Sequence, residues 1–302
     1  MGYLRRLPKF EYLAPRTIDE ACDLLAAHGS EAGLLAGGTD LLIQMRRRET
    51  SPAYIIGLKG VAELAGVCAR ADGGLAIGAT ATIQTLLTSP LVRKKYGVLC
   101  ETAALIGGPE LRCVATLGGN VAGALPCADF PPVLMTLGAK VTLRSRRGER
   151  TLAVEDFYAE FGRTVAEPSE LLTQIVLPPP PPSSGGSYLK FHDRHSMDMT
   201  TVGVGAFITW DEGRRMFGEV RIALASSAPV TQRARNAEAM LEGQPFSEER
   251  LEQAAAAACA ESNPRTSWRA TREFRLELVK TLTKRAIGQA WQKAAAAQGA
   301  HS

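Results

Sequence analysis

Ala36-Gly37-Gly38-Thr39-Asp40 and Thr116-Leu117-Gly118-Gly119-Asn120 are two glycine-rich turns in the first half of the chain, and Asp129 follows the second of them. In each turn a glycine pair permits positive φ angles and lets backbone N–H groups approach an anion. The neighbouring Thr, Asp and Asn side chains add directional hydrogen bonds. Together the turns predict the two halves of one phosphate-binding site.

The common nucleotide fingerprints are absent from both turns. Neither turn carries the lysine of a triphosphate-binding loop, and the first lacks the G-x-G-x-x-G spacing of the simple dinucleotide fold. These observations favour a nucleotide cofactor of another kind.

The first turn is predicted to lie at the start of a helix. The apolar run from Gly33 to Ala36 leads through the turn into Leu41, Leu42 and Met45, which indicates a strand, a turn and a helix. At a helix N-terminus the dipole and the unpaired N–H groups favour an anion. The predicted local structure therefore agrees with the predicted ligand.

The composition is that of an ordinary globular protein. The 302 residues are 45% hydrophobic and 22% charged, and no stretch has the roughly 18 consecutive apolar residues of a membrane span. We therefore expect a cytoplasmic protein. The net charge of +4 comes from dispersed residues and from two arginine clusters, at 46–48 and 144–150, without the interleaved aromatic residues of a nucleic-acid surface. We interpret these clusters as solvated faces and predict no nucleic-acid partner.

The cysteines and histidines do not form a predicted metal site. The six cysteines are scattered without a C-x-x-C pair and read as reduced thiols: Cys22, Cys68, Cys100, Cys113, Cys127 and Cys259. His192 and His195, near Asp193 and Asp198, are candidate ligands. In a strand, however, positions i and i+3 point to opposite faces, so no metal is predicted.

A proline run followed by serine and glycine marks the boundary between two predicted domains. We expect a first domain over 1–178, a linker over 179–186 that is stiff and then flexible, a second domain over 187–290, and an alanine-rich tail over 291–302. In the first domain helices and strands alternate. In the second, three strands of an antiparallel sheet, within 188–224, precede helices over 234–241, 247–260 and 274–290.

Several stretches resemble one known family, the FAD-binding (medium) subunits of the molybdenum hydroxylases, which include the medium subunit of carbon monoxide dehydrogenase and the flavin domain of xanthine dehydrogenase. The resemblance rests on 35–42, 116–129, 156–163 and 171–178, and on Ser227-Ala228-Pro229-Val230 with Arg233, Ala234 and Glu238. It implies an α+β fold. A two-part FAD-binding domain of the PCMH type, similar to vanillyl-alcohol oxidase, would precede a C-terminal domain of a small antiparallel sheet plus helices.

The resemblance also implies the residues that contact a noncovalently bound FAD. The first turn and its flanks would lie along the diphosphate, the second turn would close the other side, and Asp129 would hold the adenosine portion. Ile106 would neighbour the flavin, and Leu172 and Lys190 would add contacts. The full implied set is Leu34, Leu35, Ala36, Gly37, Gly38, Thr39, Asp40, Leu41, Ile106, Thr116, Leu117, Gly118, Gly119, Asn120, Asp129, Leu172 and Lys190. No catalytic side chain is implied.

Three positions, Met199, Asp40 and Asp129, qualify this picture. Some relatives place an aromatic residue beside the flavin ring where this chain aligns Met199, whose flexible thioether would pack the ring less rigidly. Asp40 and Asp129 can each be explained equally well as turn residues that make local hydrogen bonds. Gly107-Gly108-Pro109 is interpreted as the end of a helix.

The implied function is electron transfer within a larger enzyme. A large partner subunit would carry the molybdenum cofactor, a small partner would carry [2Fe-2S] clusters, and the FAD of this chain would deliver electrons to an external acceptor. The expected assembly is a dimer of heterotrimers. Two alternatives stay open: a self-sufficient flavin oxidoreductase of the vanillyl-alcohol-oxidase type, and a non-catalytic assembly subunit.

Overall fold

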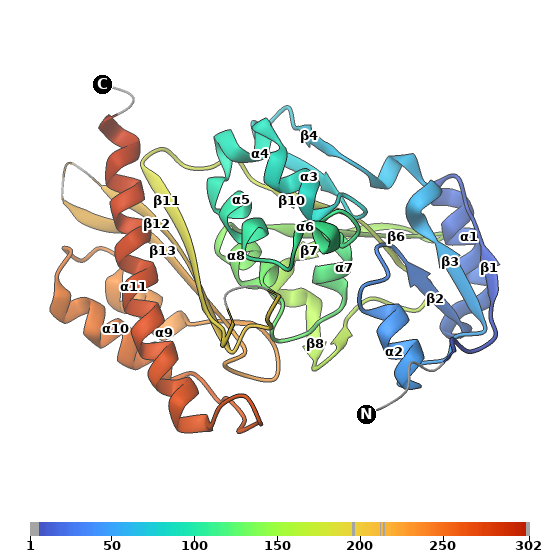
Figure 1. Ribbon diagram of the computed structural model, residues 1–302. Helices are drawn as coiled ribbons and strands as arrows, with labels where there is room; N and C mark the ends of the chain where they lie inside the picture. The colour runs from blue at the N-terminus through green and yellow to red at the C-terminus, as the bar shows by residue number, and fades with distance from the viewer. Residues whose placement is uncertain (1–5, 195–196, 212, 214, 300–302) are drawn as a thin grey trace.

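The computed structural model describes residues 6–194, 197–211, 213 and 215–299. They form three adjoining parts, which follow one another along the chain from right to left in Figure 1. None of the helices in these ranges combines the length and the apolar character that a bilayer crossing requires.

The first part is a small lobe built on a parallel sheet of order β1-β3-β2. Thr17 caps helix α1 by accepting a hydrogen bond from the Glu20 amide, while the Glu20 carboxylate turns back to the Arg16 amide. These two bonds close the N-terminus of helix α1. The elements of this lobe are β1 (Glu11–Leu13), α1 (Ile18–His28), β2 (Ala32–Leu35), α2 (Leu41–Arg47) and β3 (Tyr54–Gly57), with 3-10 turns at Gly29–Glu31, Leu58–Gly60 and Ala62–Leu64.

The second part is a five-stranded antiparallel sheet of order β4-β5-β10-β6-β7, with helices packed on it. The central strand β10 is buried along almost its whole length, as expected for a strand covered by helices. The strands are β4 (Val67–Ala69), β5 (Leu75–Gly78), β6 (Lys140–Ser145), β7 (Gly148–Ala153) and β10 (Leu171–Leu177), with a separate β8–β9 pair (Tyr158–Glu160, Arg163–Thr164) after the 3-10 turn Val154–Phe157. The helices are α3 (Ile83–Thr88), α4 (Pro90–Lys95), α5 (Gly97–Ala104), α6 (Pro109–Arg112), α7 (Leu117–Ala122) and α8 (Phe130–Thr136).

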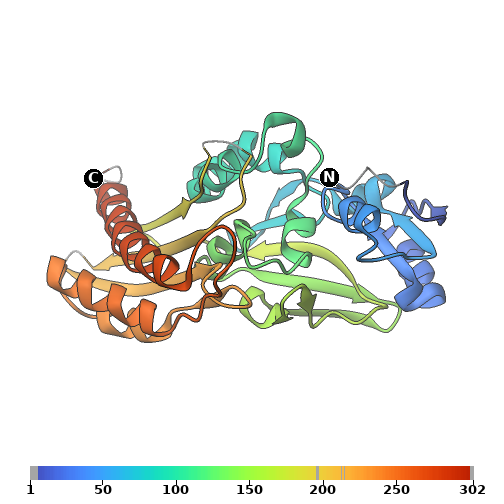
Figure 2. The same cartoon turned by 60° about the horizontal axis from the view of Figure 1, so that its bottom comes forward.

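The third part is a four-stranded antiparallel sheet covered by helices, as predicted. Its order is β11-β12-β13-β14, and the long helix α11 crosses the sheet (Figures 1 and 2). The elements are β11 (Ser184–Phe191), β12 (Val202–Asp211), β13 (Met216–Ala225), β14 (Gln232–Arg233), α9 (Arg235–Leu241), α10 (Glu248–Ala260) and α11 (Arg272–Gly299). The expected α+β class with a two-part first domain is confirmed.

The predicted flexible end of the linker is wrong, because residues 184–186 already belong to strand β11. A Cβ at Gly185 would lie 2.5 Å from the backbone nitrogen of Ala294, so glycine is there to let helix α11 approach the strand. The same contact explains the tail. Helix α11 packs on β11 at Ala290 and Ala294 and continues through Gly299, whereas a separate alanine-rich tail was expected from 291; positions 300–302 lie outside the described residues.

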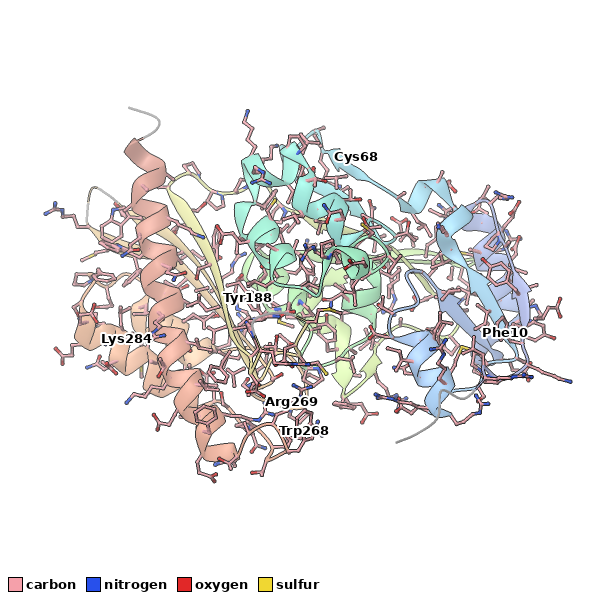
Figure 3. All side chains as sticks on the ribbon, viewed as in Figure 1. Phe10, Cys68, Tyr188, Trp268, Arg269 and Lys284 are labelled. Atoms are coloured by element: carbon pink, nitrogen blue, oxygen red, sulfur yellow. The ribbon has the colours of Figure 1, made fainter. Side chains whose placement is uncertain are left out.

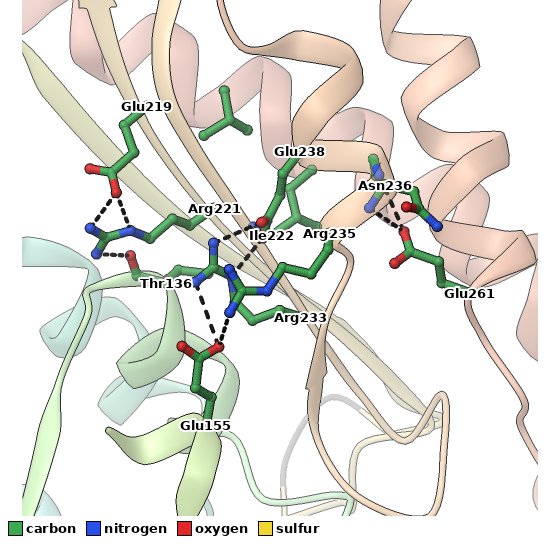
Figure 4. A network of polar contacts seen from close by, with 12 residues as sticks. Thr136, Glu155, Glu219, Arg221, Ile222, Arg233, Arg235, Asn236, Glu238 and Glu261 are labelled. Atoms are coloured by element: carbon green, nitrogen blue, oxygen red, sulfur yellow. Dashed lines mark hydrogen bonds and ion pairs between the residues drawn. The ribbon is translucent and has the colours of Figure 1, made fainter. Parts of the chain in front are cut away.

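Ion pairs join the second part to the third. Arg233 binds Glu238 within the third part and also reaches Glu155 of the second, which pairs with Arg235 as well (Figure 4). Arg221 donates to the backbone oxygen of Thr136 in helix α8. These contacts fix the third part against the back of helix α8.

Candidate functional site

A cleft of about 550 Å³ opens where the three parts meet, within the roughly 300–1,000 Å³ that small-molecule sites occupy. Its walls come from the first turn with helix α2, from the segment that runs from α5 to α8, and from the loop between β11 and β12. The lining residues used below are Ala36, Gly37, Gly38, Thr39, Asp40, Ile106, Gly107, Leu111, Thr116, Gly119, Asn120, Cys127, Asp129, Asp198 and Met199. The two glycine turns predicted to share a site are therefore on one cleft.

The first turn connects β2 to α2, as its sequence predicts. Gly38 has φ +74°, which favours glycine. Gly37 packs against the chain just before the second turn. A Cβ at this position would lie under 3.0 Å from the carbonyl group of Val114. The first turn thus touches the chain just before the second turn, through a position that only glycine can fill.

The amide groups of the first turn have no protein partner. Within the described part of the chain, the N–H groups of residues 37–41 make no hydrogen bond, and the Asp40 and Thr39 side chains make none either. Five consecutive donors therefore remain available on the wall of the cleft. A run of free N–H groups ahead of a helix suits an anion such as a phosphate.

The second turn differs, and the expectation that its amides are free for an anion is wrong. The N–H groups of Leu117 and Gly118 donate to Ala81 and Ala79, and Gly119 donates to the Thr116 hydroxyl. The Asn120 N–H donates to the Thr116 carbonyl. The bond from Leu117 belongs to an antiparallel bridge between Thr82 and Thr116, and all four N–H groups are already used within the protein.

The side chains of the second turn also serve the fold. Thr116 caps helix α7 through its bond from Gly119, and the Asn120 side-chain oxygen accepts from the Phe130 amide at the start of α8. Gly118 is buried, since a Cβ there would lie 2.5 Å from the Ala79 oxygen. What this turn can still offer a ligand is the hydroxyl hydrogen of Thr116 and the amide nitrogen of Asn120.

Asp129 joins the cleft to the third part. Its carboxylate accepts hydrogen bonds from the Tyr188 hydroxyl at 2.7 Å, the Thr200 hydroxyl at 2.6 Å and the Lys190 ammonium at 3.1 Å. The Lys190 and Asp129 side chains are only 3% and 11% exposed. Asp129 is thus not a turn residue with local bonds, because its partners all lie on β11 and the loop that follows it.

Tyr188 and Thr200 were not among the predicted site residues. Tyr188 lies on the same strand face as Lys190, two positions away, so alternation along the strand could have indicated it. Its buried position between the parts can be seen in Figure 3. Burial, followed by the nearby Asp129 charge, raises the pKa of the Tyr188 hydroxyl well above its ordinary value, so it stays a donor. Thr200 offered no signal in the sequence.

The loop after β11 is held against the cleft by a buried carboxylate. Asp198 accepts from the Arg269 guanidinium at 3.0 Å and from the backbone amides of Asp193, Arg194 and Met199. Burial alone would raise the pKa of Asp198, but these hydrogen bonds, led by that of Arg269, hold it well below its usual range. Arg269 and its neighbour Trp268 are visible below Tyr188 in Figure 3. Met199, next to Asp198, lines the cleft and is 50% exposed.

Two titratable groups in the cleft have a raised pKa. The carboxylate of Asp40 is open to the cleft, yet the surrounding walls desolvate it and raise its pKa above the ordinary 3.8. Burial, and then the charge of Asp129, raise the pKa of the Cys127 thiol. Cys127 therefore stays protonated and is a poor nucleophile.

The candidate metal-binding histidines are His192 and His195. His195 lies outside the described residues, and His192 contacts the backbone oxygen of Arg194. In the ranges that the structure describes, no three His, Cys, Asp or Glu side chains are grouped as metal ligands.

Not every predicted contact residue reaches the cleft. Twelve of the predicted positions line it: Leu34, Ala36, Gly37, Gly38, Thr39, Asp40, Leu41, Ile106, Thr116, Gly119, Asn120 and Asp129. The other five do not line it. Leu117 and Leu172 belong to the hydrophobic core, and Gly118 packs on Ala79. Leu35 lies beside Gly38, and the Lys190 ammonium is paired with the Asp129 carboxylate. The ligand contacts of all these residues stay a prediction.

Comparison with known proteins agrees with this architecture. Residues 8–180 match the family model described as the FAD binding domain in molybdopterin dehydrogenase, and residues 187–290 match the CO dehydrogenase flavoprotein C-terminal domain. The chain is 35% identical over 280 residues to a xanthine dehydrogenase FAD-binding subunit of Escherichia coli O157:H7, covering 92% of this chain and 95% of that one. It is 32% identical over 289 residues to the carbon monoxide dehydrogenase medium chain of Hydrogenophaga pseudoflava, covering 95% and 99%.

Solved structures show the same fold. The carbon monoxide dehydrogenase of Hydrogenophaga pseudoflava superposes with a TM-score of 0.92 at 33% identity, over 95% of this chain and 99% of that chain. Quinoline 2-oxidoreductase from Pseudomonas putida 86 gives 0.89 at 29% identity, over 96% and 99%. The chain therefore belongs to the family that joins the FAD-binding domain of molybdopterin dehydrogenases to the CO dehydrogenase flavoprotein C-terminal domain.

Proposed function

We propose that this chain is the FAD-binding, electron-transfer subunit of a multi-subunit molybdenum hydroxylase. The observation that carries the proposal is the run of five unpartnered amides at 37–41 on the wall of a 550 Å³ cleft. Family membership identifies the ligand class, and the free amides supply the anion site that a diphosphate requires.

The residues of the cleft fit FAD. The N–H groups of 37–41 and the Thr39 hydroxyl would hold the diphosphate, and the backbone there can approach a ligand because Gly37 and Gly38 carry no side chain. Ile106 and Leu111 provide an apolar wall for the ring system, which Met199 would border from the third part. The second turn supports this wall and would contribute the Thr116 hydroxyl and the Asn120 amide.

The chemistry would belong to the bound cofactor. A flavin accepts two electrons together or passes them singly. The residues of this chain bind and orient the ring and limit its contact with water. Cys127 is protonated and Asp129 is held by three hydrogen bonds, so neither is placed as a nucleophile or base. The unpartnered carboxylate of Asp40 belongs to the loop that would hold the diphosphate, not to the apolar wall proposed for the ring. We therefore expect no substrate oxidation by the chain alone.

The partners follow from the same proposal. Relatives of this chain are medium subunits and FAD-binding subunits of multi-subunit enzymes. We propose a large subunit with the molybdenum cofactor and a small one with [2Fe-2S] clusters, assembled as a dimer of heterotrimers that passes electrons to an external acceptor. Six unpaired cysteines agree with a cytoplasmic location. The division into domains at 1–178 and 187–290 is part of this proposal, supported by the sheet that starts at Ser184.

The test is purification of the chain, alone and with its co-expressed partner subunits, followed by flavin spectroscopy and analysis for molybdenum and iron. We expect FAD that acid precipitation releases, and substrate oxidation only in the assembled complex. Substrate turnover by the isolated chain would favour the self-sufficient oxidoreductase, and a chain without flavin would favour the assembly subunit.

A variant at Gly38 tests the site itself. Gly38→Val places a β-branched side chain at φ +74°, with its Cβ 3.0 Å from Leu35 Cδ1 and 3.1 Å from Leu42 Cδ1, and is expected to empty the cleft of flavin. Gly119→Val is expected to act in the same direction through its contact with Thr116. Gly97→Ala is the matched control, because no atom lies within 4 Å of the new Cβ. Normal flavin content in both valine variants would contradict the assignment of the turns.

A further inference from the structure

Arg112 holds the turn that forms the apolar end of the cleft. Its Nη1 atom donates to three backbone oxygens, those of Ala104 at 3.4 Å, Ile106 at 3.1 Å and Gly107 at 3.3 Å. These carbonyls follow the end of helix α5, where the last C=O groups lack helical partners. One guanidinium therefore caps the helix and fixes the chain that leads out of it.

The opposite side of this turn faces the cleft. Ile106 and Gly107 both line it, and so does Leu111, which lies directly before Arg112. Gly107 has φ +50°, and a Cβ there would lie 2.7 Å from Leu111 Cδ2. The turn has little freedom of its own, so its position depends on the group that holds its carbonyls.

The charge of Arg112 has no acidic counterpart. Among the described residues no carboxylate forms an ion pair with it, and its Nε atom is buried without a hydrogen-bond partner. Three carbonyl dipoles offset a guanidinium charge only in part. The guanidinium therefore acts as the helix cap and also brings a net positive charge to the wall of the cleft.

We propose that Arg112 is a positioning residue for the flavin ring, which fixes the wall formed by Ile106 and Gly107 and raises the reduction potential of the flavin with its unpaired charge. The inference rests on the proposed function, because it requires the ring to lie against this wall. Reduction adds negative charge to the ring, and a fixed cation in a partly desolvated wall favours that state.

The experiment compares Arg112→Gln and Arg112→Lys in the full chain, loaded with FAD and assembled with its partner subunits. The readout is the midpoint potential of the bound flavin, measured by equilibrium reduction against a reference dye, together with flavin content. Gln keeps a donor for the carbonyls but removes the charge, so its potential should shift to more negative values. Lys keeps the charge, so its potential should stay close to that of the wild type.

The matched control is Arg93→Gln. Arg93 also holds a backbone oxygen, that of Leu87 at 3.0 Å, but it does not line the cleft. It should lose stability without a change in flavin potential. An unchanged potential in Arg112→Gln with full flavin content would overturn the inference. If that variant holds no flavin, the outcome is decided by Arg112→Lys, in which a lowered potential would overturn it.

These outcomes are separate from the failure of the proposed function. A wild-type chain that binds no flavin contradicts the proposed function itself. A wild type that binds flavin, with variants that leave the potential unchanged, contradicts only the role of Arg112.

Discussion

The two glycine turns look alike in sequence but differ in what their backbone donors do. In the first turn, 37–41, the amides have no partner in the described part of the chain. In the second, 117–120, every amide already donates to Ala79, Ala81 or Thr116. The first turn is built to receive a ligand, and the second is built to hold the cleft in shape.

The glycines of the two turns are needed for correspondingly different reasons. Gly38 is required by its positive φ, whereas Gly118 is required because the Ala79 backbone lies against it. Gly37 has both roles, since its backbone amide is free for a ligand and its Cα packs on Val114. A glycine pair beside Thr or Asn therefore identifies a close backbone approach, and only the hydrogen-bond partners tell whether a ligand or the protein approaches.

The largest effect on stability is expected at Asp129, whose carboxylate binds Lys190, Tyr188 and Thr200 of the third part. Lys190→Met removes the cation from a buried pair and leaves the Asp129 carboxylate with two hydroxyl donors. Breaking such a pair costs about 3–5 kcal/mol of unfolding free energy. Urea unfolding of the purified variant measures this cost directly.

The control for this variant is a second ion pair between the same two parts. Lys293 of helix α11 pairs with Glu101 of helix α5, and their side chains are 40% and 51% exposed. Lys293→Met should therefore cost no more than about 1 kcal/mol. If both variants lose equal stability, the Asp129 cluster has no special part in the scaffold.

The second largest effect is expected where the first turn contacts Val114, just before the second turn. Gly37→Ala places a Cβ under 3.0 Å from the Val114 carbonyl, where only a backbone shift can relieve the overlap. Such overpacking costs about 3 kcal/mol, which corresponds to a roughly 100-fold loss if it falls on ligand affinity. Titration with FAD, followed by flavin fluorescence, measures the loss.

Gly97→Ala again serves as the control, because its Cβ meets open space at the start of helix α5. It should bind FAD as the wild type does. A Gly37→Ala chain with wild-type affinity would show that the contact with Val114 does not shape the ligand loop.

Local sequence patterns were sufficient to predict much of the fold. The helices over 234–241 and 247–260 were predicted within one residue of the observed bounds of α9 and α10, because their apolar positions recur at helical spacing. Strand β7 was read instead as part of a solvated arginine cluster. It is an exposed edge strand in which Arg150 pairs with Glu170, and Arg147 just before it pairs with Glu167, so its side chains carried no apolar pattern to detect.

The site was predictable only in part, because donors and acceptors distant in sequence decide it. The strand, turn and helix around Gly37 follow from a local pattern. Two of the second turn's amides are taken by the carbonyls of Ala79 and Ala81, which lie far earlier in the chain, and no local pattern indicates this contact. For the same reason Asp129 was identified, but its partners Tyr188 and Thr200 were not.

Smaller effects are expected from one threonine in each turn: a loss of FAD affinity from Thr39 and a loss of stability from Thr116. Thr39→Ala removes an unpartnered hydroxyl beside the ligand loop and should weaken FAD binding by about 1 kcal/mol, or about fivefold, with no loss of stability in the flavin-free chain. Thr116→Ala removes the cap of helix α7 and should cost about 1 kcal/mol of unfolding free energy. Thermal unfolding and FAD titration of both variants separate the two roles. Equal destabilisation of the two flavin-free chains would remove the distinction between the turns.

The smallest effect is expected from the charge of Asp40 in the ligand loop. Burial raises its pKa above 3.8 in the folded chain, so the folded chain keeps a proton that the unfolded chain has lost. The contribution of this group to stability is therefore fully present below 3.8 and declines as the pH rises through the raised pKa. The affinity for FAD should decline over the same window, because an ionised carboxylate repels a diphosphate held by the neighbouring amides. Asp40→Asn should remove this pH dependence, as measured by FAD titration across a pH series.

Asp72→Asn is the control, since Asp72 does not line the cleft and the pKa of Asp72 is lowered by its bond from the Gly74 amide. A pH dependence that persists in Asp40→Asn would mean that another group in the cleft sets it, and that the first turn binds its ligand through backbone amides alone.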